Sequence, residues 1–220
     1  SGYIKEFENL IEYIEPVDLF FNILGDNETK PILNSQRDWN RKVDIGSGTS
    51  NGVEFSYNIV KEKYQGWFSY HYGMAYRLFQ AQNDGNRFLS RYDHPNNFNI
   101  GFNINVSPKW NLGAQWIYSS GQPFTIADIE ITPPFDSIPV TQPTRKNNYR
   151  TPAFHTLNIS GEYTFKIKDI KSKLSLGVYN VYNRLNSFYI YSIKTPNNEI
   201  VFKKVSLYPI LPQINFKFYW

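Results

Sequence analysis

The sequence contains no cysteine, which excludes a disulfide framework, a thiolate metal site and a cysteine nucleophile. Its three histidines do not stand at metal-ligand spacing from one another, so we expect no metal site. No apolar run approaches the roughly 20 residues that a membrane-spanning helix needs. The basic residues are scattered despite a net charge of +4, so we expect no nucleic-acid partner. Without a convincing catalytic or phosphate-binding motif, the sequence predicts neither an enzyme nor a cofactor.

Aromatic residues, by contrast, are abundant, and Phe, Trp and Tyr make up 18% of the chain. They recur with a period of two in the stretch Asn97–Tyr118. Its first half has a large apolar residue at every even position and asparagine or glycine at every odd position. After a turn at Ser107–Lys109, the even positions are again apolar. Because successive side chains leave a strand on opposite faces, this pattern predicts a hairpin with one aromatic face and one polar face.

Two classes of all-β protein fit such a hairpin. A soluble sandwich or a lipocalin-like binder would point the apolar face into a core. In a membrane barrel the apolar face meets lipid, aromatic residues gather at both strand ends, and the lumen side is polar. The hairpin has Trp, Phe and Tyr at both ends of its apolar face and Asn, Gly and Gln on the other. The sequence therefore favours an all-β, antiparallel transmembrane β-barrel.

The same alternation predicts about eight strands in a single domain over residues 1–220. In the first of them, one face would carry Phe7, Ile11 and Tyr13, and the other would carry Glu6, Glu8 and Glu12. The expected strands are Tyr3–Ile14, Gly52–Lys61, Trp67–Phe79, Asn97–Val106, Trp110–Tyr118, Ala153–Phe165, Leu174–Tyr182 and Val205–Trp220.

The expected connections alternate in length. Long loops would occupy residues 15–51, 80–96, 119–152 and 183–204, whereas short turns would lie near Lys63, Pro108 and Asp169. Bacterial outer-membrane barrels show this asymmetry, with long loops outside the cell and short turns in the periplasm. The sequence therefore predicts an outer-membrane protein whose short turns and C-terminus are periplasmic.

Aromatic girdles follow from this orientation, because such rings concentrate at both membrane interfaces. Strands of about ten residues, tilted about 40°, span the roughly 25 Å height of the apolar band. The periplasmic girdle is predicted to contain Phe68, Trp110, Phe165, Phe218 and Trp220. The outer girdle is predicted to contain Tyr76, Phe98, Tyr118, Tyr182 and Tyr208.

Several segments resemble the C-terminal barrel region of TonB-dependent outer-membrane receptors of the Bacteroidetes type. In their order along the chain, they are Tyr92–Pro95 with Asn97–Phe98, Asn111–Pro123, Asn148–His155, Gly177–Arg184 and Val205–Pro212. The terminal Trp220 is similar to the aromatic residue by which the barrel-assembly machinery recognises such proteins. His94 departs from the family, which more often has arginine at this position.

The resemblance implies a barrel of about 22 strands filled by an N-terminal plug, and energised uptake of a nutrient ligand. This sequence has no plug, no TonB-binding segment and no signal peptide, so we expect a mature or partial chain, the last third of such a receptor. Expected partners are outer-membrane lipid, the remainder of the receptor, TonB acting through the plug, the assembly machinery and a surface lipoprotein. The alternative is a small self-closing barrel with an adhesin or structural role.

Loops carry specificity on rigid scaffolds, so the candidate ligand-binding residues lie mainly in the loops. They are Arg37, Trp39, Arg77, Arg91, Asp93, Arg145 and Arg150. The inward-facing Glu54, His71, Arg77 and Glu162 admit two interpretations, a polar wall facing water or a plug, and a substrate path. Siderophore, glycan and peptide substrates all stay open.

Overall fold

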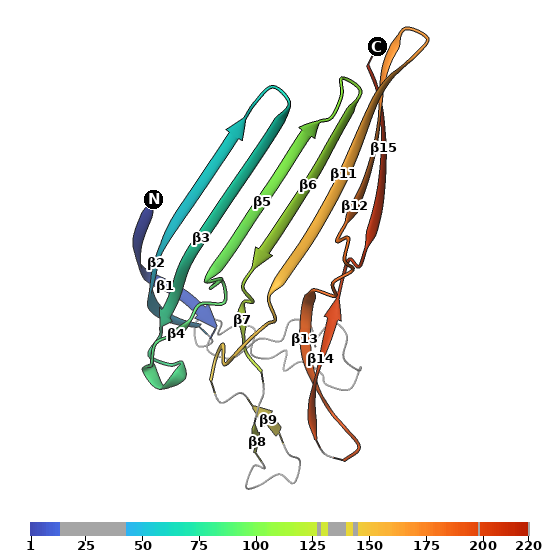
Figure 1. Cartoon of the computed structure of the whole chain (residues 1–220). Helices are drawn as coiled ribbons and strands as arrows, with labels where there is room; N and C mark the ends of the chain where they lie inside the picture. Colours follow the sequence, from blue (N-terminus) through green and yellow to red (C-terminus); the bar gives the residue numbers. More distant parts are fainter. Residues whose placement is uncertain (14–42, 127–128, 132–139, 143–144, 198, 220) are drawn as a thin grey trace.

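The computed structural model describes residues 1–13, 43–126, 129–131, 140–142, 145–197 and 199–219. Its main element is an antiparallel sheet in which eight strands follow the order β1-β2-β3-β5-β6-β11-β12-β15 (Figure 1). Their bounds are β1 Gly2–Tyr13, β2 Val43–Val60, β3 Tyr64–Leu78, β5 Asn96–Asn105, β6 Trp110–Ser119, β11 Phe154–Ile167, β12 Ile170–Tyr179 and β15 Leu211–Tyr219. The prediction of an all-β, antiparallel fold is confirmed.

The connections differ in length at the two ends of the sheet (Figure 1). Tight turns join β2 to β3, β5 to β6 and β11 to β12 at the upper end, which we call the turn end. The opposite end, the loop end, carries smaller elements: the 3-10 turn η3 (Asn83–Gly85) and the strands β4 Phe88–Leu89, β7 Pro123–Phe124, β8 Ile129–Ile131, β9 Val140–Gln142, β10 Tyr149–Arg150, β13 Ser187–Lys194 and β14 Ile200–Ser206. The predicted asymmetry of short and long connections is therefore present.

Strand β2 begins at Val43, nine residues before the predicted start at Gly52. The glycines of this segment resemble a loop in the sequence, but the structure uses them for close packing. A Cβ atom on Gly46 would lie 2.6 Å from Cδ1 of Phe79. A Cβ atom on Gly48 would lie 2.9 Å from Cδ1 of Leu10. Because glycine has no side chain, neighbouring side chains can lie across the strand here. The same glycines hide the alternation of apolar and polar residues by which a strand is recognised in a sequence.

The first strand changes face part-way, so the predicted face assignment for β1 is wrong. Its pairing with β2 shifts between Phe7 and Leu10, and Asn9 has a φ of 55°. Phe7 pairs with Gly48, whereas Ile11 pairs with Ile45. Cross-strand partners share a face, and Gly48 and Ile45 point to opposite faces because their positions along β2 differ by three, an odd number. A bulge of this kind inserts an unpaired residue and reverses the alternation beyond it.

The last strand is shorter than predicted. Residues before it form a separate hairpin, in which β13 pairs with β14 from Ser187–Ser206 to Lys194–Ile200. Strand β15 then begins at Leu211 rather than Val205. Tyr208, with a φ of 57°, lies between the two strands and marks the bend. The predicted loop 183–204 is thus largely a two-stranded ribbon extending beyond the sheet (Figure 1).

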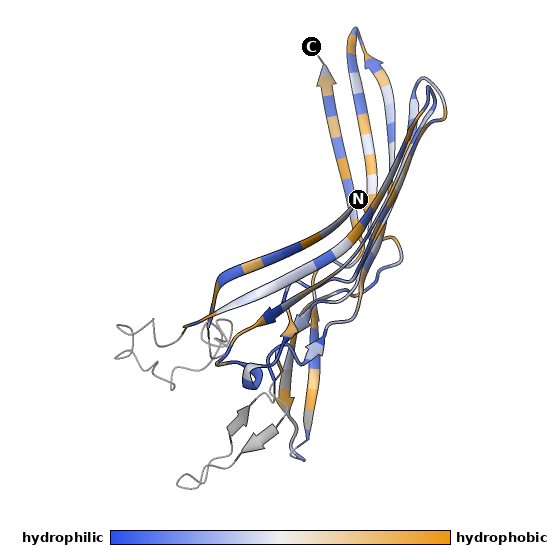
Figure 2. Ribbon diagram, turned by 90° about the vertical axis from the view of Figure 1, so that its left-hand side faces the viewer, coloured by the Kyte–Doolittle hydropathy of each residue, from blue (hydrophilic) through white to orange (hydrophobic). Residues whose placement is uncertain are grey.

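The sheet leaves its apolar face uncovered. Among the described residues, the buried apolar ones are Phe79, Phe88 and Ile126, all toward the loop end. Apolar side chains on the strands stay exposed instead, with Ile214 at 76% and Ile4 at 81%. Figure 2 shows hydrophobic and hydrophilic residues alternating along the strands. The described part of the chain contains no helix long and apolar enough to cross a membrane.

The two outermost strands of the sheet are β1 and β15. Within the described residues, β1 pairs only with β2 and β15 pairs only with β12. The sheet is therefore open and each edge presents a row of unpaired backbone groups.

Candidate functional site

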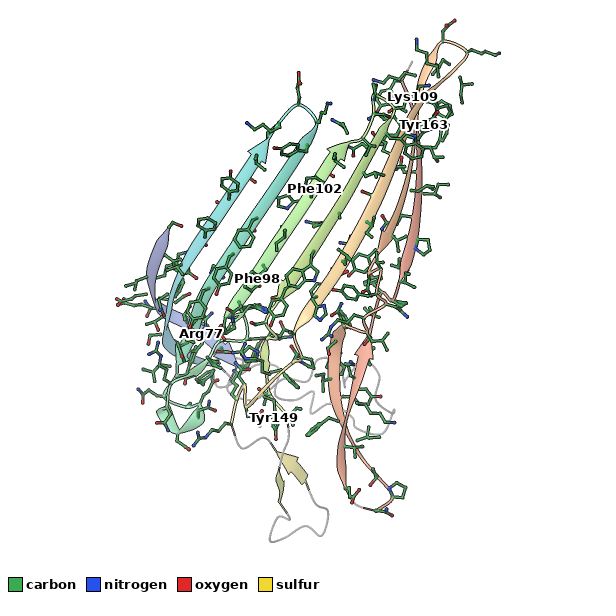
Figure 3. All side chains as sticks on the ribbon, viewed as in Figure 1. Arg77, Phe98, Phe102, Lys109, Tyr149 and Tyr163 are labelled. Carbon is green, nitrogen blue, oxygen red and sulfur yellow. The ribbon has the colours of Figure 1, made fainter. Side chains whose placement is uncertain are left out.

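The apolar face carries a row of aromatic rings in contact with one another near the turn end. Trp110 of β6 packs on Tyr163 of β11 with ring centroids 4.7 Å apart. The row continues from Phe165 to Phe216 of β15 at 5.8 Å and ends with Phe218, whose ring is 4.5 Å from that of Phe216. Lys109 and Tyr163 lie close together at this end of the sheet (Figure 3). Three residues of the predicted periplasmic girdle, Trp110, Phe165 and Phe218, belong to this row. Trp220 lies outside the described residues.

A second aromatic row crosses the same face nearer the loop end. Phe98 of β5 stacks on Tyr70 of β3 at 4.4 Å and contacts Tyr118 of β6 at 5.8 Å. The row continues through His155, whose Nδ1 lies 2.7 Å from the hydroxyl of Tyr182. Phe98, Tyr118 and Tyr182 belong to the predicted outer girdle, whereas Tyr70 and His155 were not predicted there. Phe98 lies below Phe102 in Figure 3. That lipid surrounds both rows stays a prediction.

Two other predicted girdle residues have partners of their own. Phe68 packs on Phe55 with centroids 5.8 Å apart. The guanidinium of Arg87 lies 3.9 Å from the centre of the Tyr76 ring. A cation over an aromatic face at the edge of an apolar surface is suited to a membrane interface, where one side of the pair stays hydrated.

The opposite face of the sheet is a network of amides and hydroxyls. The Oδ1 atom of Asn99 accepts hydrogen bonds from Trp67 Nε1 at 3.2 Å and from Gln115 Nε2 at 3.1 Å. Nearby, Ser119 donates to Asn97 Oδ1 at 2.6 Å. The side chains of neighbouring strands thus satisfy one another laterally, as buried polar groups must.

His71 sits within this network on β3. A hydrogen bond of 2.9 Å joins its Nε2 to the hydroxyl of Tyr3 on β1, and its Nδ1 lies 3.3 Å from Asn97 Nδ2 on β5. Glu54, its direct cross-strand partner on β2, accepts a 3.3 Å hydrogen bond from the Ser1 hydroxyl. Through His71, side-chain contacts therefore connect β1 to β3 and β3 to β5 across the polar face.

A hollow of about 300 Å³ lies on the polar face, lined by neutral residues from six strands, β3, β5, β6, β11, β12 and β15. The Trp67 indole lies across Gly101, where a Cβ atom would come within 1.9 Å of Cζ2. Only the absence of a side chain at position 101 lets the ring lie there. The lining includes Trp67, Asn103, Gln115, Asn158, Tyr179 and Gln213. Such a surface can donate and accept hydrogen bonds without carrying charge.

At the loop end, the structure brings two of the predicted ligand-binding residues together. The Asp93 carboxylate is buried and forms a salt bridge with Arg150 of β10. Its Oδ1 also accepts a 2.8 Å hydrogen bond from the Ala75 backbone N–H, and Arg150 Nη1 donates to the Asp93 carbonyl at 2.9 Å. Here both residues hold the loop after β4 against β3 and β10. That either of them contacts a ligand stays a prediction.

The other predicted residues lie apart. Arg77 points toward the loop end (Figure 3) and its Nε lies 3.4 Å from the Ser90 hydroxyl. Arg91 and Arg145 are exposed. Neither makes an ion pair with a described residue, so both guanidinium groups are accessible from outside. The predictions for Arg37 and Trp39 fall outside the described residues.

Sequence reasoning missed the residues that hold the loops most firmly. Lys146 Nζ forms a 2.9 Å ion pair with Glu12 of β1 and donates to Gln82 Oε1 at 2.8 Å. Asn180 is fully buried, with Oδ1 accepting from the Arg184 backbone N–H at 3.0 Å. Asn180 has a φ of 55°, a conformation in which asparagine is enriched. The sequence signal that could have identified this position is Asn180 itself, which stands just before the turn at Tyr182 and Asn183.

No three His, Asp or Glu side chains of the described residues come together as a metal site would require. The described residues instead form a sheet with one apolar face and one hydrogen-bonding face. Accessible arginines lie at its loop end.

Comparison with known proteins gives one family match. The model for the TonB dependent receptor-like β-barrel matches residues 1–181. None of the curated proteins compared with the chain matches it. The match covers β1 to β12 and therefore most of the two-faced sheet. The chain belongs to the β-barrel family of TonB-dependent receptors, the transporters and receptors of the outer membrane.

Proposed function

We propose that the chain forms part of the wall of a transporter barrel through which a nutrient ligand enters in an energised, TonB-dependent step. The observation that carries the proposal is the family match across a sheet with one aromatic and one amide-rich face. Lipid would contact the aromatic rows, and the face with Asn97, Asn99 and Gln115 would line the lumen. Unlike a soluble core, such a wall needs no second layer over its apolar side.

The open edges support a larger barrel. Every backbone group exposed to hydrocarbon without a partner costs several kcal/mol, so β1 and β15 need neighbours in the membrane. Further strands of the receptor would supply them, with a plug inside and TonB acting on that plug. The short turns and the C-terminus would then face the periplasm, where Trp220 would engage the assembly machinery.

Ligand would first meet the loop end. Arg91 and Arg145 are exposed there and make no ion pair with a described residue. Arg77, Asp93 and Arg150 are candidates at the same end of the sheet, with Arg37 and Trp39 as further candidates from the sequence. A surface lipoprotein could cover the same loops. Arginine favours ligands with carboxylate or phosphate groups, or other oxygen-rich anions.

Uptake of labelled ligands by whole cells tests this function. Cells with and without the gene would be offered labelled ferric siderophores, oligosaccharides and peptides, each with and without a protonophore. We expect one class to accumulate only when both the gene and the proton gradient are present. Accumulation that persists after gene deletion, or that ignores the protonophore for every class, would contradict the proposal.

A matched pair of variants checks where the ligand binds. Arg145→Ala, at an exposed loop position, should raise the ligand concentration needed for half-maximal uptake. Lys63→Ala, at an exposed position of the β2–β3 turn, removes the same charge from the other end of the sheet. It should leave uptake unchanged.

A further inference from the structure

Lysines gather on the polar face at the turn end of β11, β12 and β15. Lys166 of β11 is the direct partner of Lys171 on β12, and Lys173 of β12 is the direct partner of Lys217 on β15. Direct partners share a face, and so do residues two apart on one strand. Lys173 forms a salt bridge with Glu162, which identifies that face as the polar one. We call these four residues the lysine cluster.

The lysine cluster is electrostatically unbalanced. Like charges directly opposite one another on neighbouring strands are destabilising, yet the cluster contains two such pairs. Glu162 engages Lys173, while Lys166, Lys171 and Lys217 are exposed and form no ion pair with the described residues. Lys171 has the Tyr219 ring 5.8 Å away, a long cation–π contact that adds no negative charge. The polar face therefore keeps uncompensated positive charge at this end.

We infer that the lysine cluster is a docking site for an acidic peptide segment lying on the polar face. Its two rows are two residues apart along the strands, or about 6.6 Å, and neighbouring strands are about 4.8 Å apart. Side chains on alternate residues of an extended peptide repeat at the same spacing. Carboxylates in that pattern would meet one row after the other. Lipid does not fit, because the cluster lies on the face opposite the aromatic rows.

This inference relies on the proposed function only in taking the polar face as the lumen wall. Its test therefore measures binding and not uptake. The protein would be extracted in detergent from outer membranes and titrated with a fluorescein-labelled peptide in which glutamate and serine alternate. The same peptide with glutamine in place of glutamate provides the neutral control.

Two double variants carry the same charge change at the same end of the sheet. Lys171→Gln with Lys217→Gln removes half of the cluster, whereas Lys61→Gln with Lys63→Gln removes two exposed lysines of the β2–β3 turn. We expect the cluster double variant to weaken binding of the glutamate peptide about tenfold, because each exposed lysine–glutamate ion pair contributes about threefold. The second should leave binding within about twofold of the parent. Parent binding should also weaken as salt rises, because exposed charges are screened.

Four outcomes would overturn the inference: no binding of the glutamate peptide, equal binding of the glutamine peptide, equal loss in both double variants, or loss in neither. Vesicles containing phosphatidylglycerol provide a last comparison. If the cluster variant loses vesicle binding but keeps peptide binding, the cluster serves lipid and the inference is wrong. A heat-shifted gel band for each variant shows that a changed affinity does not come from misfolding.

Discussion

Asp93 and Arg150 lie 57 residues apart in the sequence, yet their side chains form a salt bridge at the loop end of the sheet. The carboxylate is fully buried, whereas the arginine side chain is 32% exposed. The pair joins the loop preceding β5 to β10. Loops anchored in this way can hold exposed side chains such as Arg91, a candidate ligand-binding residue, in place.

Breaking this pair should loosen the loop. Arg150→Ala leaves the buried carboxylate with its Ala75 hydrogen bond but without its counter-charge. Hydrogen bonds to charged groups contribute about 1.5–3 kcal/mol, so local opening should become easier and trypsin cleavage after Arg91 at least about tenfold faster. Arg145→Ala, five residues away and exposed, is the matched control. Equal cleavage rates in the two variants would show that the salt bridge does not hold the loop.

The regular strands were predictable because their side chains keep a strict period of two. The hairpin of β5 and β6 is nearly as expected, since Phe98, Ile100 and Phe102 alternate with Asn and Gly. That period reports the apolar face wherever the backbone stays regular. A single bulge at Asn9 is enough to reverse the faces of β1, and nothing in its residue types reveals it.

The site was harder to predict than the sheet. The pairing of Asp93 with Arg150 depends on a loop and the short strand β10 meeting at the loop end, which local sequence does not encode. The packing of Phe79 over Gly46 likewise depends on the contact between β2 and β3. Sequence reasoning selected charged loop residues as candidates, but it could not separate those that bind each other from those that stay accessible.

The alternation of faces predicts opposite results for two neighbouring positions. Phe102 is 44% exposed on the aromatic face, while Asn103 lines the hollow on the polar face. Phe102→Arg should cost roughly 2–4 kcal/mol near the bilayer midplane and block stable insertion. Asn103→Arg should insert normally, because the lumen is hydrated. Heat-modifiable gel mobility of outer-membrane fractions measures both, and identical behaviour would refute the assignment of faces.

The Trp67 indole should be sensitive to a single methyl group. Gly101→Ala would place Cβ within 1.9 Å of Cζ2, so the indole must move and lose its hydrogen bond to Asn99. Overpacking of this kind costs about 1–3 kcal/mol. Gly177→Ala is the control, since its nearest atoms lie at 3.5 Å or beyond. Denaturant titration in detergent compares the two, and in a Trp67→Leu background the cost at Gly101 should largely disappear.

The absence of cysteine allows the orientation to be mapped with single substitutions. Arg145→Cys lies at the loop end and Lys63→Cys at the turn end, both exposed. A maleimide that cannot cross the outer membrane should label only the first in intact cells, and both after the membrane is permeabilised. Labelling of Lys63→Cys alone in intact cells would invert the proposed orientation and place the C-terminus outside.

The open edges predict that residues 1–220 do not form a stable barrel by themselves. Closing eight strands would bring β1 against β15 and leave an interior just wide enough for side chains to fill it. The polar face, however, has small residues such as Gly113 and Gly177 lining a hollow of about 300 Å³. Left open in a membrane, both edges would instead expose backbone groups at several kcal/mol each.

Refolded alone in detergent, residues 1–220 should therefore give no heat-resistant monomeric band, whereas adding the strands that flank β1 and β15 in the receptor should restore one. A compact, β-rich, heat-resistant monomer from residues 1–220 would favour a small self-closing barrel and remove the support that the open edges give to a larger one.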